Sequence, residues 1–205
     1  MTETPTNKTP FRKTHPTDEA YEHLTFDKEH VPLATIDGMR GRVVSIGSAG
    51  KTFSFTGWKV GWATATPDLI NAIRTTKQFL TYVSSGPFQY AVAQAFDLPD
   101  SYYTEMAADL KAKRDLMTAG LREIGFAVYE PDGTYFITAD IAPLGEQDAM
   151  AFCRGLPDRV GVVAIPSAVF YDDHPEEGRT LVRFAFCKRT EVLKEALSRL
   201  SALTR

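Results

Sequence analysis

Lys51, a lysine flanked by small residues, is the side chain in this 205-residue sequence best suited to covalent chemistry. It lies in Gly47-Ser48-Ala49-Gly50-Lys51-Thr52, where small neighbours allow a lysine to approach a bound cofactor closely. The β-branched run Arg42–Ile46 comes just before this loop and predicts a buried strand that leads into it. After the loop, Gly57–Ala65 alternates aromatic and small residues, which favours a second strand over a helix.

The residues alone leave three interpretations of Lys51 open. The first is a phosphate-binding P-loop, because Gly50-Lys51-Thr52 matches the end of that motif. The motif also needs a glycine at the position of Ser45 and leads directly into a helix, whereas a strand is predicted here. The second interpretation is a solvated loop lysine without chemistry. The third is a lysine that forms a Schiff base with the aldehyde of pyridoxal 5'-phosphate and later moves a proton. That chemistry needs hydroxyl and cationic contacts to the phosphate, and Ser48 and Lys59 are suitable donors.

The wider pattern around Lys51 resembles a known family signature. Ser48-x-x-Lys51-x-x-Ser54-Phe55-x-Gly57-Trp58-Lys59-Val60-Gly61 closely resembles the pyridoxal-phosphate attachment site of class I/II aminotransferases, which have the fold type I architecture. The resemblance implies that Lys51 is the catalytic lysine and that Ser48 and Lys59 contact the cofactor phosphate. Most of the family has arginine at the position of Lys59, whereas lysine occurs in the branch with kynurenine and cysteine-conjugate enzymes. The phosphate contact then changes from a bidentate fork to a point charge.

Three other segments agree with this resemblance. Asp18-x-x-Tyr21 resembles the element whose aspartate pairs with the cofactor's pyridine nitrogen and whose tyrosine bonds the ring oxygen. Gly133–Phe136 resembles a turn and strand near the substrate. Val182–Lys188 is similar to the late strand whose arginine, here Arg183, binds the substrate α-carboxylate through a guanidinium fork.

The elements that must position these residues mix helices and strands. Helices are predicted from Pro67 to Leu80, from near Pro87 to before Pro99, from about Asp100 to Ile124, at Glu146–Leu156 and at Thr190–Leu203. Further strands are predicted at Ala127–Tyr129, Tyr135–Ala139, Val160–Ile165 and Thr180–Cys187. This pattern predicts an α/β or α+β architecture in two lobes joined near 98–100.

Together with the resemblance, the pattern predicts a partial fold type I aminotransferase. Residues 1–16, rich in Thr, Pro and Lys, are expected to form a disordered tail. Residues 17–98 are expected to form a partial large cofactor-binding domain, a remnant of the large-domain sheet. Residues 99–205 are expected to form the α+β C-terminal small domain.

The resemblance runs from about Asp18 to the C-terminus and corresponds to the second half of a family member. The preceding Arg12–Thr17 carries two cations and a proline, so no buried strand is predicted there, and the strand before Lys51 is expected to have an unpaired edge. Family members are homodimers with sites at the subunit interface. The chain is therefore predicted to form a homodimer or to pair with a separate N-terminal half, the alternative being a non-catalytic remnant.

The substrates that the resemblance implies are an amino acid and a 2-oxo acid. Gly161–Pro166 and Phe184–Arg189 resemble most the actinobacterial enzymes that act on N-succinyl-LL-2,6-diaminopimelate with glutamate and 2-oxoglutarate. Kynurenine-type transamination and cysteine-conjugate β-elimination use the same residues and stay open.

Composition and charge argue against several other classes. A net charge of −3 without a basic cluster gives no nucleic-acid footprint. No stretch approaches the roughly 18–20 apolar residues of a membrane helix, and no secretory signal is evident, which predicts a cytoplasmic protein. Cys153 and Cys187 lie far apart and predict reduced thiols, and the four histidines lack metal-ligand spacing.

Overall fold

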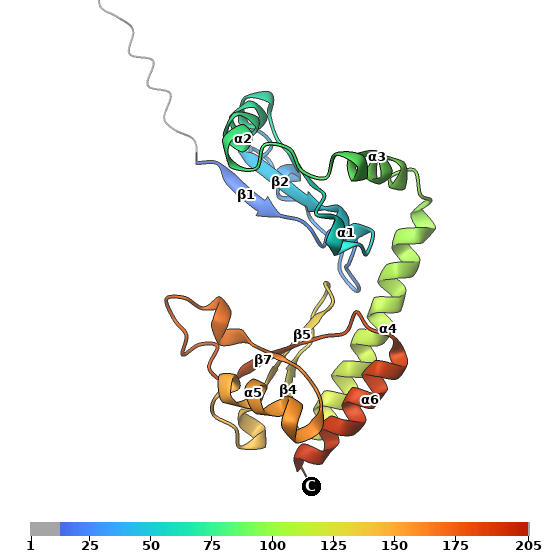
Figure 1. Cartoon of the computed structure of the whole chain (residues 1–205), viewed down its shortest axis with the longest axis vertical. Coiled ribbons are helices and arrows are strands. Elements are labelled where there is room, and N and C mark those ends of the chain that lie inside the picture. Colours follow the sequence, from blue (N-terminus) through green and yellow to red (C-terminus); the bar gives the residue numbers. More distant parts are fainter. Residues whose placement is uncertain (1–12, 205) are drawn as a thin grey trace, which may run out of the picture. The chain divides into compact units, whose positions relative to one another are not determined.

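A computed structural model describes residues 13–204 of the chain, which divide into two compact units (Figure 1). The first unit contains the described residues up to Glu22 together with His30–Leu98, and the second contains His23–Glu29 and Pro99 onward. Most of the predicted tail, 1–12, lies outside the described residues. The predicted α/β class is confirmed, because both units combine a sheet with helices.

A three-stranded sheet in the order β1-β2-β3 forms the centre of the first unit. Strand β1 (His15–Asp18) runs parallel to β2 (Val43–Ser48), and β3 (Gly61–Thr64) runs antiparallel to it. The expectation that β2 has an unpaired edge is therefore wrong, because both of its edges are paired. The two edges that stay unpaired within this sheet belong to β1 and β3.

No buried strand leads into Asp18, in agreement with the prediction, but an edge strand does, and it begins at His15 within the predicted tail. Strand β1 lies at the sheet edge, and its residues alternate between half-buried and exposed. His15 N donates to Arg42 O and Glu19 N donates to Ile46 O, so alternate residues face β2. Pro16 falls between these donors and its nitrogen points away from the ladder, which is why an edge strand tolerates it.

The segment after β2 is helical before it becomes a strand. Helix α1 (Ala49–Thr52) is one turn long, and a 3-10 turn, η2 (Thr56–Trp58), replaces the first part of the predicted strand. Lys59 then adopts the left-handed conformation, with φ 54°, and only Gly61–Thr64 is extended. An alternation of aromatic and small residues does not reveal this break, because the left-handed residue is not a glycine.

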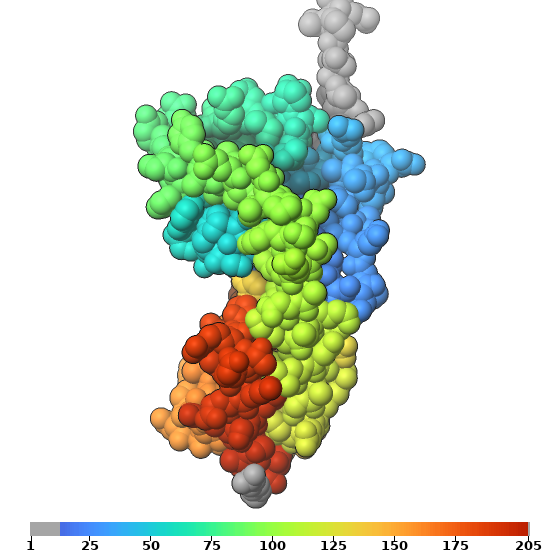
Figure 2. All heavy atoms as spheres, turned by 90° about the vertical axis from the view of Figure 1, so that its right-hand side faces the viewer, coloured from blue at the N-terminus to red at the C-terminus, as the bar shows by residue number. Residues whose placement is uncertain are grey.

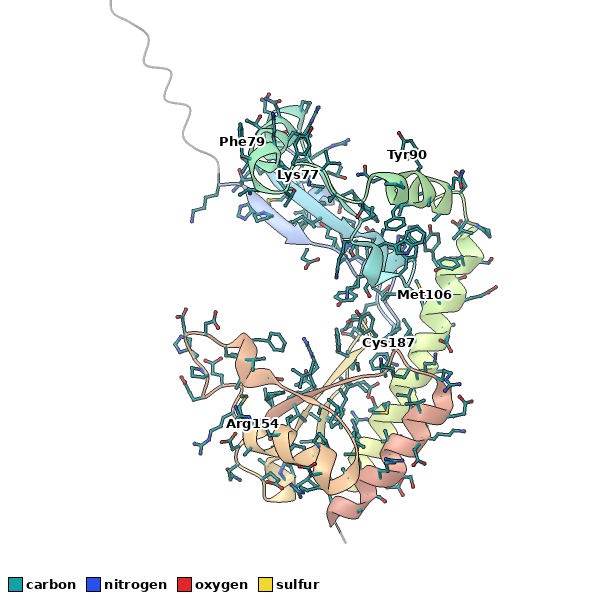
Figure 3. All side chains as sticks on the ribbon, in the orientation of Figure 1. Lys77, Phe79, Tyr90, Met106, Arg154 and Cys187 are labelled. Atoms are coloured by element: carbon teal, nitrogen blue, oxygen red, sulfur yellow. The ribbon has the colours of Figure 1, made fainter. Side chains whose placement is uncertain are left out.

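Two helices and a short turn complete the first unit. They are η1 (Leu33–Thr35), α2 (Pro67–Leu80) and α3 (Gly86–Ala95). Helix α2 contains no buried residue, and the apolar side chains at its end and in α3 are largely exposed; Figure 3 labels Phe79 and Tyr90 among them. The exposed set, called here the 79–90 surface, comprises Phe79, Leu80, Tyr82, Val83, Phe88 and Tyr90.

A four-stranded antiparallel sheet in the order β4-β5-β7-β6 forms the second unit, with helices packed on one face. The strands are β4 (Ala127–Tyr129), β5 (Phe136–Asp140), β6 (Ile165–Pro166) and β7 (Leu181–Ala185). The helices are α4 (Asp100–Ile124), α5 (Ala149–Val160) and α6 (Thr190–Leu200), with 3-10 turns η3 (Ala142–Leu144), η4 (Ser167–Phe170) and η5 (Ser201–Thr204). Figure 2 shows α6 lying along α4.

Periodicity in β5 and β7 explains this packing. Ile137, Ala139, Val182 and Phe184 are buried, whereas the alternate residues are half-buried. The buried face meets α-helical residues such as Phe152, whose ring packs edge-on against Phe126. The predicted strand Val160–Ile165 is mostly wrong, because α5 continues to Val160 and only Ile165–Pro166 pairs with β7.

The segment His23–Glu29 belongs to the second unit, although the predicted boundaries placed it in the first. Its backbone bonds the connection between β4 and β5: Thr134 N donates to Leu24 O at 2.7 Å, and Phe26 N donates to Asp132 O at 2.9 Å. The Arg114 guanidinium on α4 contacts Asp27 Oδ2 at 2.9 Å. These nonlocal contacts have no counterpart in local sequence patterns.

Candidate functional site

The carboxyl ends of β1 and β2 bring several of the predicted site residues together. Because these strands are parallel, their carboxyl ends meet at one sheet edge, and Asp18 pairs with Ile46, two residues before Ser48. Tyr21 follows β1, and Lys51 lies in the helical turn after β2. The Lys51 Nζ atom is 5.6 Å from the centroid of the Tyr21 ring.

A hollow of about 150 Å³ unites the two predicted phosphate contacts with the predicted catalytic lysine. Its lining consists of Ser48, Gly50, Lys51, Thr56, Lys59 and Val60. Ala49 N donates to Val60 O at 3.1 Å, which ties the two sides of the loop together. A Cβ added to Gly50 would lie 2.8 Å from the Thr56 Cα, so only glycine allows the two backbone segments to approach this closely.

The chemistry of this hollow suits an anion. Two lysines and two hydroxyl residues, Ser48 and Thr56, line it, and no carboxylate is among its lining residues. Lys51 is half-buried and Lys59 is exposed. A phosphate group would therefore meet cationic and hydroxyl donors without having to displace a competing acidic side chain.

Asp18 lies at the end of β1 with an exposed side chain. Its Oδ1 atom accepts a hydrogen bond from Ala20 N at 3.1 Å, a short turn within the segment. The next residue, Glu19, is buried instead: Ser45 Oγ donates to its Oε1 at 3.1 Å, and His30 Nε2 lies 3.1 Å from its Oε2. Sequence reasoning missed Glu19, because an acidic residue beside another acidic residue carries no signal of burial.

Arg183 belongs to the second unit, on β7. Its guanidinium lies 4.3 Å from the ring centroids of both Phe136 and Phe170. Its Nε atom is buried and has no hydrogen-bond partner among the residues that the structure describes. A buried N–H without an acceptor is unfavourable, and a ligand carboxylate would satisfy it. Sequence reasoning missed Phe170, because only the fold brings η4 beside β7.

Arg183 also lines an apolar cavity of about 570 Å³ within the second unit. The segment 161–165 and residues of α6 line much of the rest of this cavity.

No group of three or more metal-ligating side chains occurs within residues 13–204. No helix in the same part of the chain is long and apolar enough to cross a membrane.

The family assignment follows from comparison with known proteins. A model of aminotransferase class I and II matches residues 16–200, nearly the whole described chain. The chain belongs to this family. The predicted resemblance is confirmed, and with it the fold type I architecture, of which the chain represents about half.

Among curated relatives, the probable N-succinyldiaminopimelate aminotransferase DapC of Mycobacterium tuberculosis is 50% identical over 197 residues. This match covers 91% of the chain and 49% of the relative. The kynurenine–oxoglutarate transaminase of Dictyostelium discoideum is 39% identical and is covered to 46%. The chain therefore spans about half the length of the curated relatives that it matches.

Solved structures also match this chain over about half of their own length. The N-succinyldiaminopimelate aminotransferase structure from Mycobacterium tuberculosis has a TM-score of 0.88 at 50% identity, with 93% of this chain and 50% of that chain covered. Bna3p of Saccharomyces cerevisiae, a putative kynurenine aminotransferase in the words of its structure report, has a TM-score of 0.85 at 29% identity, with 93% and 49% covered.

Proposed function

We propose that this chain supplies the lysine-bearing half of a pyridoxal-phosphate-dependent aminotransferase. The observation that carries the proposal is the hollow in which Ser48, Lys51 and Lys59 lie together, with the Tyr21 ring 5.6 Å from Lys51 Nζ. Three residues of the attachment signature and one of the Asp18-x-x-Tyr21 segment thus lie on one unit. A solvated loop lysine would not require this arrangement.

The residues present fit the cofactor. Ser48 Oγ and Lys59 Nζ would bind its phosphate, and Lys51 Nζ would bind its aldehyde carbon covalently. The Tyr21 hydroxyl would donate a hydrogen bond to the ring oxygen of the cofactor, and the Asp18 carboxylate would pair with its pyridine nitrogen. When bound, pyridoxal phosphate supplies an electron sink for the charge left when the substrate α-proton departs. Lys51 Nζ would then carry that proton.

The orphaned donor of Arg183 supports a carboxylate-binding role. The Phe136 and Phe170 rings both contact the guanidinium, with centroids 4.3 Å from it, and we infer that a ligand would reach its N–H groups from the edge of the guanidinium plane. Edge-on approach matches a planar carboxylate in bidentate geometry. The second unit would thereby bind the α-carboxylate of the amino acid and of the 2-oxo acid.

The substrate pair we propose is N-succinyl-LL-2,6-diaminopimelate with glutamate and 2-oxoglutarate, and the 50% identical relative, whose name is probable N-succinyldiaminopimelate aminotransferase, supports the first of these. Relatives named as kynurenine transaminases support the runner-up, kynurenine-type transamination, and cysteine-conjugate β-elimination stays a prediction. The cytoplasmic location inferred from composition also stays a prediction.

The partner we propose is a second protein surface, in a homodimer or in an assembly with a separate N-terminal half. The 79–90 surface supports this proposal, because exposed apolar side chains of this size usually mark an interface. Whether an adjacent reading frame encodes the other half distinguishes a split enzyme from a non-catalytic remnant.

The central test is covalent attachment. The purified chain, alone and co-expressed with an N-terminal half, is mixed with pyridoxal phosphate and then reduced with borohydride. We expect a visible absorbance band before reduction and cofactor mass on the Lys51 peptide afterwards. Lys51→Ala is the matched control; equal labelling in that variant, or no band in either preparation of the wild type, would refute the proposal.

Arg183 is tested separately. In Arg183→Ala, we expect cofactor attachment to persist while added amino acid no longer changes the absorbance spectrum. Arg183→Lys keeps the charge but loses the fork, so it should recover only part of the response. Simultaneous loss of attachment and response in both variants would indicate a structural role instead.

A further inference from the structure

Ser85, outside the family signature, contacts the turn that carries Lys59. Its hydroxyl donates to Trp58 O at 2.7 Å and approaches Lys59 O at 3.4 Å. Ser85 stands at the N-cap position of α3, where a serine normally accepts from a backbone N–H of its own helix. Here no such capping bond is present. The hydroxyl is directed to the Lys59 turn instead.

Both ends of this contact have unusual backbone conformations. Lys59 has φ 54° and ψ 44°, and Ser85 has φ 52° and ψ 36°. The left-handed region is unfavourable for a non-glycine residue, because the Cβ atom comes too close to the following carbonyl oxygen. Such a conformation persists only when surrounding contacts stabilise it. Because a hydrogen bond from Ser85 reaches the turn of Lys59, we infer that this contact helps to stabilise both left-handed residues.

Other contacts restrict the same turn. The Trp58 ring stacks on Phe88 of α3, with centroids 4.5 Å apart and planes at 19°. The Phe55 ring also contacts the Trp58 ring, with centroids 4.5 Å apart. These ring contacts restrain the Trp58 side chain but do not involve its backbone carbonyl. The Ser85 hydroxyl is the described contact that reaches the Trp58 carbonyl, the group that moves when the φ of Lys59 changes.

We propose that Ser85 is a positioning residue for Lys59, whose hydroxyl holds the left-handed turn from which this lysine lines the anion-binding hollow beside Lys51. The inference rests on the proposed function, because the anion concerned is the cofactor phosphate. Ser85 itself does not line the hollow. Its effect is exerted through the backbone of Lys59.

The test compares two ligands that differ only in the phosphate, pyridoxal phosphate and pyridoxal, on the full chain. In Ser85→Ala, we expect the affinity for pyridoxal phosphate to fall by about 3- to 10-fold, the effect of one neutral hydrogen bond. The affinity for pyridoxal should be unchanged. Ser84→Ala is the matched control, since Ser84 contributes only its backbone oxygen, to Gln89 Nε2.

Two further variants separate the effect of the hydroxyl from that of backbone strain at Ser85. Ser85→Gly adopts the left-handed conformation without strain and still lacks the hydroxyl, so it should lose as much affinity as Ser85→Ala. In a Lys59→Ala background, Ser85→Ala should have no additional effect. The inference would be overturned if Ser85→Ala lowered the affinities for pyridoxal phosphate and pyridoxal equally, or if Ser85→Gly bound pyridoxal phosphate as tightly as the wild type does.

One measurement does not need the cofactor. The ¹³Cα chemical shift of Lys59 in the ligand-free chain reports its φ and ψ, and we expect left-handed values in the wild type and averaged values in Ser85→Ala. Unchanged left-handed values in Ser85→Ala would overturn the positioning role. If the wild type binds neither ligand, the proposed function fails, while this shift still decides what Ser85 does.

Discussion

The Arg114 guanidinium, buried on α4, is the described group whose removal should most weaken the second unit. Only 4% of its side chain is exposed. It contacts Asp27 Oδ2 at 2.9 Å, Asp115 Oδ1 at 2.8 Å through Nε, and Pro131 O at 3.1 Å, and lies 5.0 Å from the Phe26 ring centroid. One side chain thereby links α4, the segment His23–Glu29 and the connection between β4 and β5.

Arg114→Met removes these polar contacts and keeps an unbranched apolar stem. Breaking a fully buried ion pair costs about 3–5 kcal/mol, mainly because the partner charge is left without water. Here both aspartates are 52% exposed and regain water, so the cost is smaller. The Pro131 carbonyl loses its donor, and Phe26 loses a stacked cation. We therefore expect the free energy of unfolding to fall by about 2–3 kcal/mol.

Urea unfolding followed by circular dichroism measures this loss, with Arg122→Met as the matched control. Arg122 lies on the same helix, pairs with Glu130 at 3.0 Å and is 52% exposed. An exposed pair contributes about 0–1 kcal/mol, so the control should change stability little. If Arg114→Met costs no more than Arg122→Met, the argument from burial is wrong.

The pH dependence provides a second check on the same pair. The hydrogen bond from Arg114, with help from Lys111, lowers the pKa of Asp27 below its ordinary value of 3.8. A lowered carboxyl pKa stabilises the fold fully above the ordinary pKa, and this stability is lost as the pH falls through the folded-state pKa. The difference in the free energy of unfolding between wild type and Arg114→Met should therefore become smaller below pH 3.8. A difference that stays constant into acid would exclude a contribution from the Asp27 charge.

Three further predictions concern a cap, two thiols and a close backbone approach. Asp148 Oδ1 accepts from two backbone N–H groups at the start of α5, so Asp148→Ala should lower the free energy of unfolding by about 1 kcal/mol, measured by urea titration. Burial raises the pKa of the Cys153 thiol to about 11, so a thiol reagent at pH 8 should label the exposed Cys187 rapidly and Cys153 only after unfolding, as mass spectrometry would show. Gly50→Ala should abolish cofactor attachment because its Cβ meets backbone at 2.8 Å, whereas Gly57→Ala, with open space around it, should not.

The elements that local patterns specify agree best with their predictions. The sequence predicts a helix from about Asp100 to Ile124 and α4 has these bounds, because one apolar stripe and the stop at Gly125 act within a single segment. Strand β4 has its predicted bounds as well. The sequence does not predict strand β1, since its formation depends on pairing with β2, which lies 28 residues further along the chain by the His15–Val43 register.

Site residues follow the same division between local and nonlocal information. Ser48, Lys51 and Lys59 fall within one continuous signature, and the structure brings them to one hollow. Their roles are proposals, but the sequence already predicts that they lie close together, because one short loop connects them. Glu19, Phe170 and Ser85 contact partners that lie far from them in the chain, so no local sequence pattern singles them out.

The phosphate contacts and the exposed apolar surface of the first unit are expected to depend differently on a partner protein. The phosphate contacts that we propose come from one loop, closed by Gly50 and braced by α3, all within the first unit. The 79–90 surface, in contrast, exposes apolar area, and we propose that a partner protein covers it. Anion affinity should therefore depend little on a partner, whereas preorganisation of the ring and the carboxylate contacts should depend on it strongly. Comparing pyridoxal phosphate with pyridoxal, with and without a partner half, separates the two contributions.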